Sequence, residues 1–427
     1  MRLQKEDLRP AAVSVRVMRT LLSVGVAFCL GAGIVLADFV AEPRPIAYLS
    51  RPLIAIFVLS AVIGLVSGFF GRMSAAIATF VVVWVVRPDS ALLVFAGGLV
   101  VVLIAARLWR GQFMEVGKPV GAAAATFLVA GLIPVVPLMA EDPPADSSPS
   151  MIGVPTYLIL VDGYPRPDTL AANGVDISPF LDQLEERGFD IYPDATSHHS
   201  RTFRTLTHMM SGHPMDKDDD GTPEERRQAR ESWSLPRGFV QIASPYGPAT
   251  IPGTRTLNPG GPTIFESVLL QSSILGWVSG DYVMDGMRYQ VNRSLDLLAS
   301  TDEWRVFAHI IAPHLPYLYE GDLPASAPEC WPICSLYHPV QDPEQAVERV
   351  GLYLKWLNPR LLDSIDSILA RNDDAEIVLF SDHGGRFSED DSEEWHRPFL
   401  AARSPTRPKF FAGSPHPSRV LDLIHDG

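Results

Sequence analysis

Long apolar segments fill the first third of the chain, whereas short apolar runs alternate with amphipathic stretches in the rest. A helix needs roughly 20 apolar residues to span a bilayer. Five segments approach that length, and the third and fourth are short enough to form a re-entrant hairpin instead or to borrow flanking residues. The pattern predicts a membrane domain over residues 1–140 with about five transmembrane helices. These helices are expected at 20–37, 53–70, 74–86, 91–106 and 120–140.

Basic residues flank these segments unequally. Five precede the first segment, from Arg2 to Arg19, and three lie between the fourth and the fifth, from Arg107 to Lys118. The positive-inside rule places both groups in the cytoplasm, so an odd number of spans delivers the remaining chain to the outer side. A cleaved signal peptide is the alternative for the first segment, but further apolar segments follow and no small-residue cleavage site stands out. We expect a multi-pass protein of the cell (inner or plasma) membrane with an extracytoplasmic domain.

The amino-acid composition of the chain changes after residue 140. Residues 141–153 form a linker rich in Pro, Ser and Asp, and residues 156–161 are a continuous apolar run of strand length. Such a run, without polar alternation, is typical of a strand buried on both faces of a parallel sheet. Residues 178–187 carry apolar side chains on one helical face, with Ser178 as the expected N-cap and Pro179 in the first turn.

Predicted helices and strands alternate along this outer domain. The alternation predicts an α/β fold with a doubly wound, mostly parallel sheet over residues 154–427. The charged run 216–230 and the Pro/Gly-rich stretch 236–262 are expected to be solvated loops. Further helices are expected at 264–271 and 347–370, and further strands at 274–278, 305–312 and 376–381.

Charge differs sharply between the two parts of the chain. Residues 1–140 contain 12 Lys or Arg and 6 Asp or Glu, so the net charge of −14 for the whole chain leaves −20 for the outer domain. A domain this acidic repels the phosphates of nucleic acid, and we expect no nucleic-acid partner. Cys330 and Cys334 lie in this domain, where an oxidising compartment permits a disulfide. A local disulfide and two free thiols are both open.

Acidic and histidine residues follow three of the predicted strands. Asp162, His314 and the pair Asp382 and His383 each stand just past a strand end, which is the edge where open α/β sheets bind ligands. Carboxylate oxygen and imidazole nitrogen suit zinc or manganese, and a metal ion lowers the pKa of a bound hydroxyl. Each signal alone is weak, because an Asp-Gly pair is more often a turn and a lone Asp-His pair is usually on the surface. Together they predict a metal site.

Four motifs resemble the alkaline phosphatase and sulfatase superfamily over about residues 154–404. The distance of ten residues from Thr202 to Gly212 is similar to that between the nucleophile and the Gly closing its helix in that superfamily. Thr202-Phe203 with Gly212 and Pro214 also resembles nucleotide pyrophosphatase/phosphodiesterases, whose nucleophile is a metal-bound Thr. The motifs are Val161-Asp162-Gly163, the run from Ser178-Pro179 to Gly188-Phe189, Ser200-Arg201-Thr202-Phe203 with Ser211-Gly212, and Ser381-Asp382-His383-Gly384.

The resemblance implies an alkaline phosphatase-like fold with Thr202 as the catalytic nucleophile. Type I sulfatases tend to place two adjacent Asp residues after the first strand, whereas Asp162 stands alone here, so one divalent metal ion is expected rather than two. The expected ion is zinc or manganese, with magnesium or calcium as alternatives. Type I sulfatases carry a C/S-x-P-x-R motif that is oxidised to formylglycine, whereas Thr202, Arg204 and Leu206 take the Cys, Pro and Arg places here. The implied metal ligands are Asp162, Thr202, Asp382 and His383.

The predicted membrane anchor makes the chain similar to lipoteichoic acid synthases and lipid A phosphoethanolamine transferases, which take phosphoglycerol or phosphoethanolamine from a phospholipid. Those enzymes usually have Glu where Asp162 stands, so this position departs from the pattern. Residues 313–317 resemble the His-x-Pro-Tyr segment of the synthases, which implies that His314 contacts substrate. His396 and Arg201 are further substrate-binding candidates. The alternative for His396 is a solvent-facing side chain beside the acidic segment 389–394, and the alternative for Arg201 is neutralisation of nearby acidic charge.

The expected function is that of a membrane-anchored, metal-dependent phosphotransferase or phosphoric ester hydrolase. Its substrate is expected to be a phospholipid or an envelope glycan bearing phosphate, with membrane lipid as its surroundings. One alternative is a sulfuric ester hydrolase that works without formylglycine. The other is a catalytically inactive membrane scaffold or sensor, whose signature would be the loss of ligands that are all present here.

Overall fold

The chain forms two compact units, one made of Met1–Glu141 and Phe265–Ser279 and the other of Asp142–Ile264 and Gly280–Gly427. The computed structural model describes residues 50–67, 154–214, 222–243, 251–261, 276–327, 343–385 and 393–425, with a few single positions besides.

In the first unit the structure describes helix α2 (Ser50–Ser67), which overlaps the second predicted membrane segment. Within the described ranges, every helix is too short or too polar to cross a membrane. The other predicted membrane segments and the linker 141–153 lie outside the described residues, apart from three helical positions in the first segment. Cys330 and Cys334 lie outside them as well. The five-helix anchor therefore stays a prediction.

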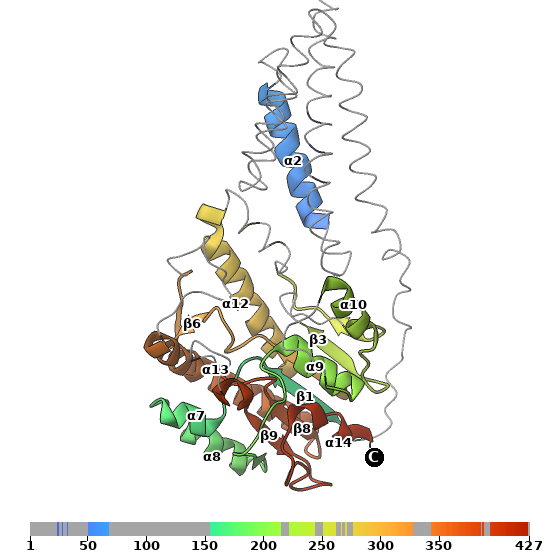
Figure 1. Cartoon of the computed structure of the whole chain (residues 1–427), viewed down its shortest axis with the longest axis vertical. Coiled ribbons are helices and arrows are strands. Elements are labelled where there is room, and N and C mark those ends of the chain that lie inside the picture. Colours follow the sequence, from blue (N-terminus) through green and yellow to red (C-terminus); the bar gives the residue numbers. More distant parts are fainter. Residues whose placement is uncertain are drawn as a thin grey trace, which may run out of the picture. The chain divides into compact units, whose positions relative to one another are not determined.

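Seven strands form one sheet in the second unit, in the order β2-β9-β8-β1-β5-β3-β4 (Figure 1). Neighbours from β8 to β4 are parallel, whereas β9 pairs antiparallel with β8 and with β2. The mostly parallel α/β domain predicted from the sequence is confirmed. The strands are β1 (Thr156–Val161), β2 (Asp190–Ile191), β3 (Val240–Ala243), β4 (Arg255–Leu257), β5 (Arg305–Ile310), β8 (Glu376–Phe380) and β9 (Leu400–Arg403), and β6 (Tyr319–Glu320) and β7 (Leu323–Pro324) form a separate hairpin.

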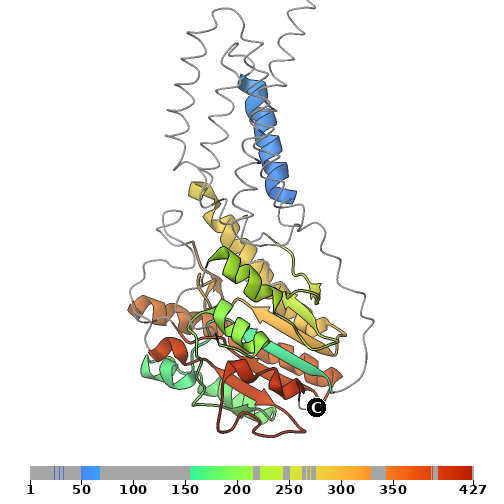
Figure 2. The same ribbon diagram turned by 45° about the vertical axis from the view of Figure 1, so that its right-hand side comes forward.

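Helices cover both faces of this sheet (Figures 1 and 2). Leu158 and Leu160 of β1 pack in one buried cluster with Phe203 and Leu206 of α9. Successive side chains of a strand point to opposite faces. The hydroxyl of Tyr157 accordingly reaches the residues that follow α12 and α13, where it donates to the Glu303 carbonyl and accepts from the Asn372 side chain. The helices are α7 (Pro167–Ala172), α8 (Ser178–Glu186), α9 (Thr202–Ser211), α10 (Pro223–Glu231), α12 (Gly276–Ser300), α13 (Pro343–Arg371) and α14 (Asp422–His425).

Three expectations from the sequence are wrong. Helix α10 lies in the charged run, where the Thr222 hydroxyl accepts from the Glu225 backbone and the Glu225 carboxylate accepts from Thr222, a capping box that stabilises a helix start. Strands β3 and β4 lie in the Pro/Gly-rich stretch and extend the sheet beyond β5. Residues 276–278 belong to α12 and not to a strand, because a short apolar run fits either element.

The start of α8 also differs from the prediction. Ser178 is the first helical residue and the cap position is Ile177. The Asp176 carboxylate accepts from both the backbone nitrogen and the hydroxyl of Ser178, at 2.9 and 2.7 Å. The Ser178 hydroxyl thus donates to Asp176, and the cap position Ile177 makes no side-chain capping hydrogen bond.

Candidate metal centre

Asp162 stands at the middle of the carboxyl edge of the sheet, directly after β1. Its side chain is only 5% exposed. The next residue, Gly163, has φ +71°, and a Cβ there would lie 3.3 Å from the His383 ring and 3.4 Å from the His314 ring. Glycine at this position therefore lets two imidazoles approach the aspartate closely.

Asp382 and His383 follow β8, the neighbour of β1, and are 0% and 1% exposed. The Gly163 backbone donates to Asp382 Oδ1 at 3.2 Å. The Ser381 hydroxyl accepts from the Tyr164 backbone and donates to the His383 carbonyl, which holds the pair in place. Asp382 Oδ2 and His383 Nε2 lie 3.6 Å apart and have no hydrogen-bond partner. Two buried orphan acceptors of this kind suit a cation.

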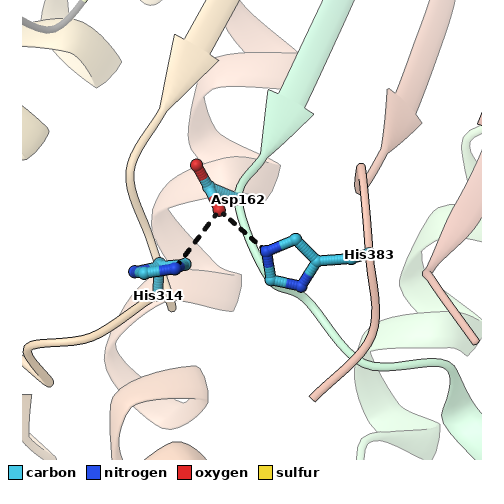
Figure 3. A group of neighbouring side chains, drawn as sticks. All are labelled: Asp162, His314 and His383. Carbon is cyan, nitrogen blue, oxygen red and sulfur yellow. Dashed lines mark ion pairs between the residues drawn. The ribbon is translucent and has the colours of Figure 1, made fainter. Parts of the chain in front are cut away.

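Asp162, His314 and His383 converge at this point (Figure 3). Asp162 Oδ1 lies 3.6 Å from His383 Nε2 and 4.0 Å from His314 Nε2. One ligand atom from each of the three lies within 4.8 Å of the others. Oxygen and nitrogen donors at these separations fit a divalent ion such as zinc or manganese. The structure thus adds His314 as a possible ligand, and the substrate contact predicted for it stays a prediction.

Thr202 is the first residue of α9 and points at the same aspartate. Its Oγ1 lies 3.4 Å from both carboxylate oxygens of Asp162. One turn further, the Thr205 hydroxyl donates to the Asp382 carbonyl at 3.0 Å and fastens the helix to the end of β8. The four residues predicted as metal ligands therefore lie close together, although they belong to three separate segments of the chain.

His309, inside β5, was missed by sequence reasoning, which favours a structural role for a lone histidine. It is 1% exposed, and its Nε2 lies 2.9 Å from Asp162 Oδ2. A polar residue within a buried apolar run was the available signal, but its partner depends on β5 pairing beside β1. Burial raises the pKa of Asp162, but the charge of His314 and the His309 hydrogen bond lower it more, so the net pKa is lowered and the group stays a carboxylate.

Replacing His309 with phenylalanine is expected to weaken metal binding and turnover by about 10- to 100-fold, because partners that orient metal ligands have effects of this size. Zinc affinity by calorimetry and kcat/KM would measure the change. His309→Gln, which keeps a donor near Asp162, should recover part of both. Unchanged zinc affinity in His309→Phe would show that the hydrogen bond does not support the site.

The Gly after the Asp-His pair has a steric explanation. A Cβ on Gly384 would lie 2.1 Å from the Glu394 carbonyl and 2.7 Å from that of Arg397. The Gly384 backbone also donates to the Trp395 carbonyl at 2.7 Å. Only glycine allows the segment with His396 to pack directly on the loop that carries Asp382 and His383.

His396 and Arg201 are not among the side chains that converge in Figure 3. His396 ends the 3-10 helix Glu393–His396, and its Nδ1 lies 2.9 Å from the Ser197 carbonyl, in the segment that leads into α9. Arg201 is exposed at the N-cap of α9. Their substrate contacts stay predictions.

A second group of histidines lies beside α9. The ring of His198 is 4.2 Å from that of His416 and 5.2 Å from that of His208, and His199 lies 5.7 Å from His208. Burial lowers the pKa of His199 to about 4 and that of His416 to about 3, and the neighbouring histidines add to both shifts. The rings of His199 and His416 are therefore neutral at pH 7.

Acid is expected to destabilise the metal-free protein through these rings. An unfolded histidine has a pKa of about 6.5, so between about pH 6.5 and 4 the unfolded chain binds protons that the folded chain does not. Stability should fall over this window by on the order of 1–3 kcal/mol. Urea unfolding in chelator at pH 7 and 5 would measure it. His416→Asn should flatten the dependence relative to the exposed control His213→Asn, and equal slopes would contradict the assignment.

No family model matches the sequence, and no curated protein matches it. Among solved structures, the C-terminal periplasmic domain of EcEptC from Escherichia coli is similar at 13% identity and TM-score 0.39, over 67% of this chain and 86% of that chain. The integral membrane lipooligosaccharide phosphoethanolamine transferase A from Neisseria meningitidis is similar at 13% identity and TM-score 0.37, over 96% and 83%. The phosphonate monoester hydrolase SpPMH from Silicibacter pomeroyi is similar at 15% identity and TM-score 0.38, over 64% of this chain and 73% of that chain. Likeness at this level does not identify a function, which has to come from the residues of the site.

Proposed function

We propose that this protein is a metal-dependent phosphotransferase or phosphoric ester hydrolase of the alkaline phosphatase superfamily, with Thr202 as its nucleophile. The observation that carries the proposal is the position of Thr202 Oγ1, 3.4 Å from both oxygens of Asp162, beside the buried unpartnered atoms Asp382 Oδ2 and His383 Nε2. A structural metal site would not need a threonine hydroxyl at the start of a helix.

The residues that would hold the ion are Asp162, Asp382, His383 and Thr202, with His314 within reach. A divalent ion, when bound, would lower the pKa of a hydroxyl beside it and offset charge on phosphate oxygens. Asp162 accepts from Thr202 and fixes the direction of its oxygen. The backbone N–H groups at the start of α9 add a favourable field for a phosphate.

In the proposed reaction, Thr202 Oγ1 loses its proton to solvent and bonds to phosphorus, while the bond from phosphorus to the leaving-group oxygen breaks in line and that oxygen takes a proton from solvent. This gives a phosphothreonine that an acceptor hydroxyl or water then discharges. His314, on the segment after β5, would hold the equatorial oxygens or the leaving group. The two outcomes differ only in the acceptor, so the same residues serve a transferase and a hydrolase.

We propose the outer side of a membrane as the place of this reaction and a lipid- or glycan-linked phosphate as its substrate. The support is the run of apolar segments in residues 1–140 and the basic residues that flank them. An anchored site meets phospholipid headgroups at high local concentration, which favours a lipid donor.

The test uses the full chain in detergent with added zinc. Hydrolysis of bis(p-nitrophenyl) phosphate that EDTA abolishes and zinc restores is expected, with p-nitrophenyl sulfate turned over more slowly. Incubation with a phospholipid labelled in its headgroup then separates a modified acceptor from free headgroup phosphate. Faster turnover of the sulfate ester would favour a sulfatase, and no turnover of either ester would favour the inactive scaffold.

A further inference from the structure

Residues 195–201, which we call the approach segment, lead directly into α9 and belong to no helix or strand. The residue that follows them is Thr202, the first residue of α9. Because no ladder of regular structure holds the approach segment, its backbone groups have to find other partners. The place of the Thr202 hydroxyl therefore depends on the individual bonds that this segment makes.

Two backbone N–H groups of the approach segment donate to residues near the end of the chain. Thr196 donates to the Pro415 carbonyl at 3.0 Å. His198 donates to Nε2 of the His416 ring at 2.9 Å. Residues i and i+2 of a strand bond to one neighbouring strand in this way, and here the imidazole nitrogen takes the place of the second carbonyl. The backbone cannot supply that carbonyl itself, because the 3-10 helix Pro417–Arg419 begins at the next residue.

The other side of the approach segment is held by His396, in the segment that packs on the loop after β8. The Ser197 backbone N–H donates to the His396 carbonyl at 2.9 Å. His396 Nδ1 lies 2.9 Å from the Ser197 carbonyl. Within the approach segment, the Ser197 hydroxyl donates to the His199 carbonyl at 2.8 Å. His416 thus supplies one of two opposite sets of contacts that fix this stretch of backbone.

The surroundings of His416 decide which of its nitrogens accepts. Burial lowers the pKa of His416 to about 3, so the ring is neutral at pH 7 and has one acceptor nitrogen. A backbone N–H points to each nitrogen, that of His198 to Nε2 and that of Ser418 to Nδ1. Nδ1 also lies 2.7 Å from the Ser418 hydroxyl, which can accept a proton. The assignment that satisfies the ring therefore puts the proton on Nδ1 and the lone pair on Nε2.

We propose that His416 is a positioning residue for Thr202 and that it acts by accepting the backbone N–H of His198. This inference rests on the proposed role of Thr202 as the nucleophile. Apolar contacts hold the rest of the chain end independently, since Val420 and Leu421 lie in the same buried cluster as apolar residues of α9. Removing the acceptor at His416 therefore frees the approach segment without detaching the chain end.

Two substitutions of His416 separate this role from the capping of the 3-10 helix. In His416→Gln the side-chain oxygen takes the place of Nε2 and can accept from His198, whereas in His416→Asn it takes the place of Nδ1 and can serve only Ser418. Turnover of bis(p-nitrophenyl) phosphate by the full chain in detergent with zinc measures the result. His416→Asn should lower kcat about 10-fold and leave KM within about twofold, because a displaced nucleophile slows the chemical step. His416→Gln should keep kcat within about threefold of the natural chain.

Hydrogen exchange at pH 7, followed by mass spectrometry, measures the same contact without turnover. The peptide that covers residues 195–201 should exchange faster in His416→Asn than in His416→Gln or the natural chain, whereas peptides from β1 should not change. His213→Asn, an exposed histidine beyond α9, should match the natural chain in both measurements. A thermal melt would confirm that each variant is folded.

Three results would overturn the proposal. The first is an equal or larger loss in His416→Gln than in His416→Asn, since the contact with Ser418 would then be the one that matters. The second is natural kcat and natural exchange in His416→Asn, and the third is faster exchange in that variant without a loss of kcat. A natural chain without esterase activity would contradict the proposed function alone, because the exchange measurement does not depend on turnover.

Discussion

Replacing Thr202 with alanine is expected to abolish turnover while leaving the fold intact. Removing a covalent nucleophile lowers kcat by at least about 10⁴-fold, because the remaining groups can bind the substrate but cannot form the intermediate. Thr202 is half-buried and its hydroxyl contacts only the Asp162 carboxylate among the bonds described, so the cost in stability should stay within about 1 kcal/mol. Esterase assays and a thermal melt would measure the two effects.

Thr202→Ser is the matched control, since it keeps the oxygen and removes one methyl group. It should retain measurable turnover and, with a slow substrate, a phosphate on residue 202 that mass spectrometry of a peptide digest can locate. Alanine at Thr205, whose hydroxyl bonds the Asp382 carbonyl, would separate a loss of helix position from a loss of the nucleophile. Full activity in Thr202→Ala would refute the central claim.

Asp382→Asn is expected to have the second largest effect, through loss of the metal ion. The amide oxygen can still accept from the Gly163 backbone, so the change removes the charge at Oδ2 with little change of shape. A direct ligand should matter more than the outer partners whose loss costs about 10- to 100-fold, so zinc affinity at this site should fall by more than about 100-fold and turnover with it.

Zinc titration followed by calorimetry, with turnover measured at each zinc concentration, would test this. Excess zinc should restore part of the activity, because the maximal rate is limited by occupancy of the site. Asp366→Asn is a suitable control, since that carboxylate pairs with Arg187 at the surface. If Asp382→Asn bound zinc as tightly as the natural chain, Asp382 would not be a ligand.

The sequence allowed the meeting of Asp162 and Asp382 to be predicted, because the carboxyl ends of parallel strands lie at one edge of the sheet. Asp162 and Asp382 follow strands that prove to be neighbours, so strand order brings together residues 220 apart in the chain. Thr202 was found by resemblance to known motifs, and its contact with Asp162 agrees with that resemblance. Neither result needed knowledge of side-chain packing.

Packing decided the residues that were missed. Nothing in the run around His309 distinguishes a buried structural histidine from one bonded to Asp162, since the difference arises only when β5 pairs with β1 in the observed register. The four histidines beside α9 lie up to 218 residues apart, and the bond from the His198 backbone to His416 brings the chain end to the approach segment. Local patterns carry no information about such contacts.

By itself, the sequence determined the mostly parallel α/β domain, the strand ends that carry Asp162 and Asp382, and the candidate nucleophile. Those features follow from apolar periodicity and short motifs, which act over a few residues. Only the tertiary structure decided that β3 and β4 extend the sheet, that His309 supports Asp162, and that three imidazoles gather beside α9. The physical reason is that burial and close approach of distant segments set hydrogen bonds and pKa values, and these arise when the chain packs.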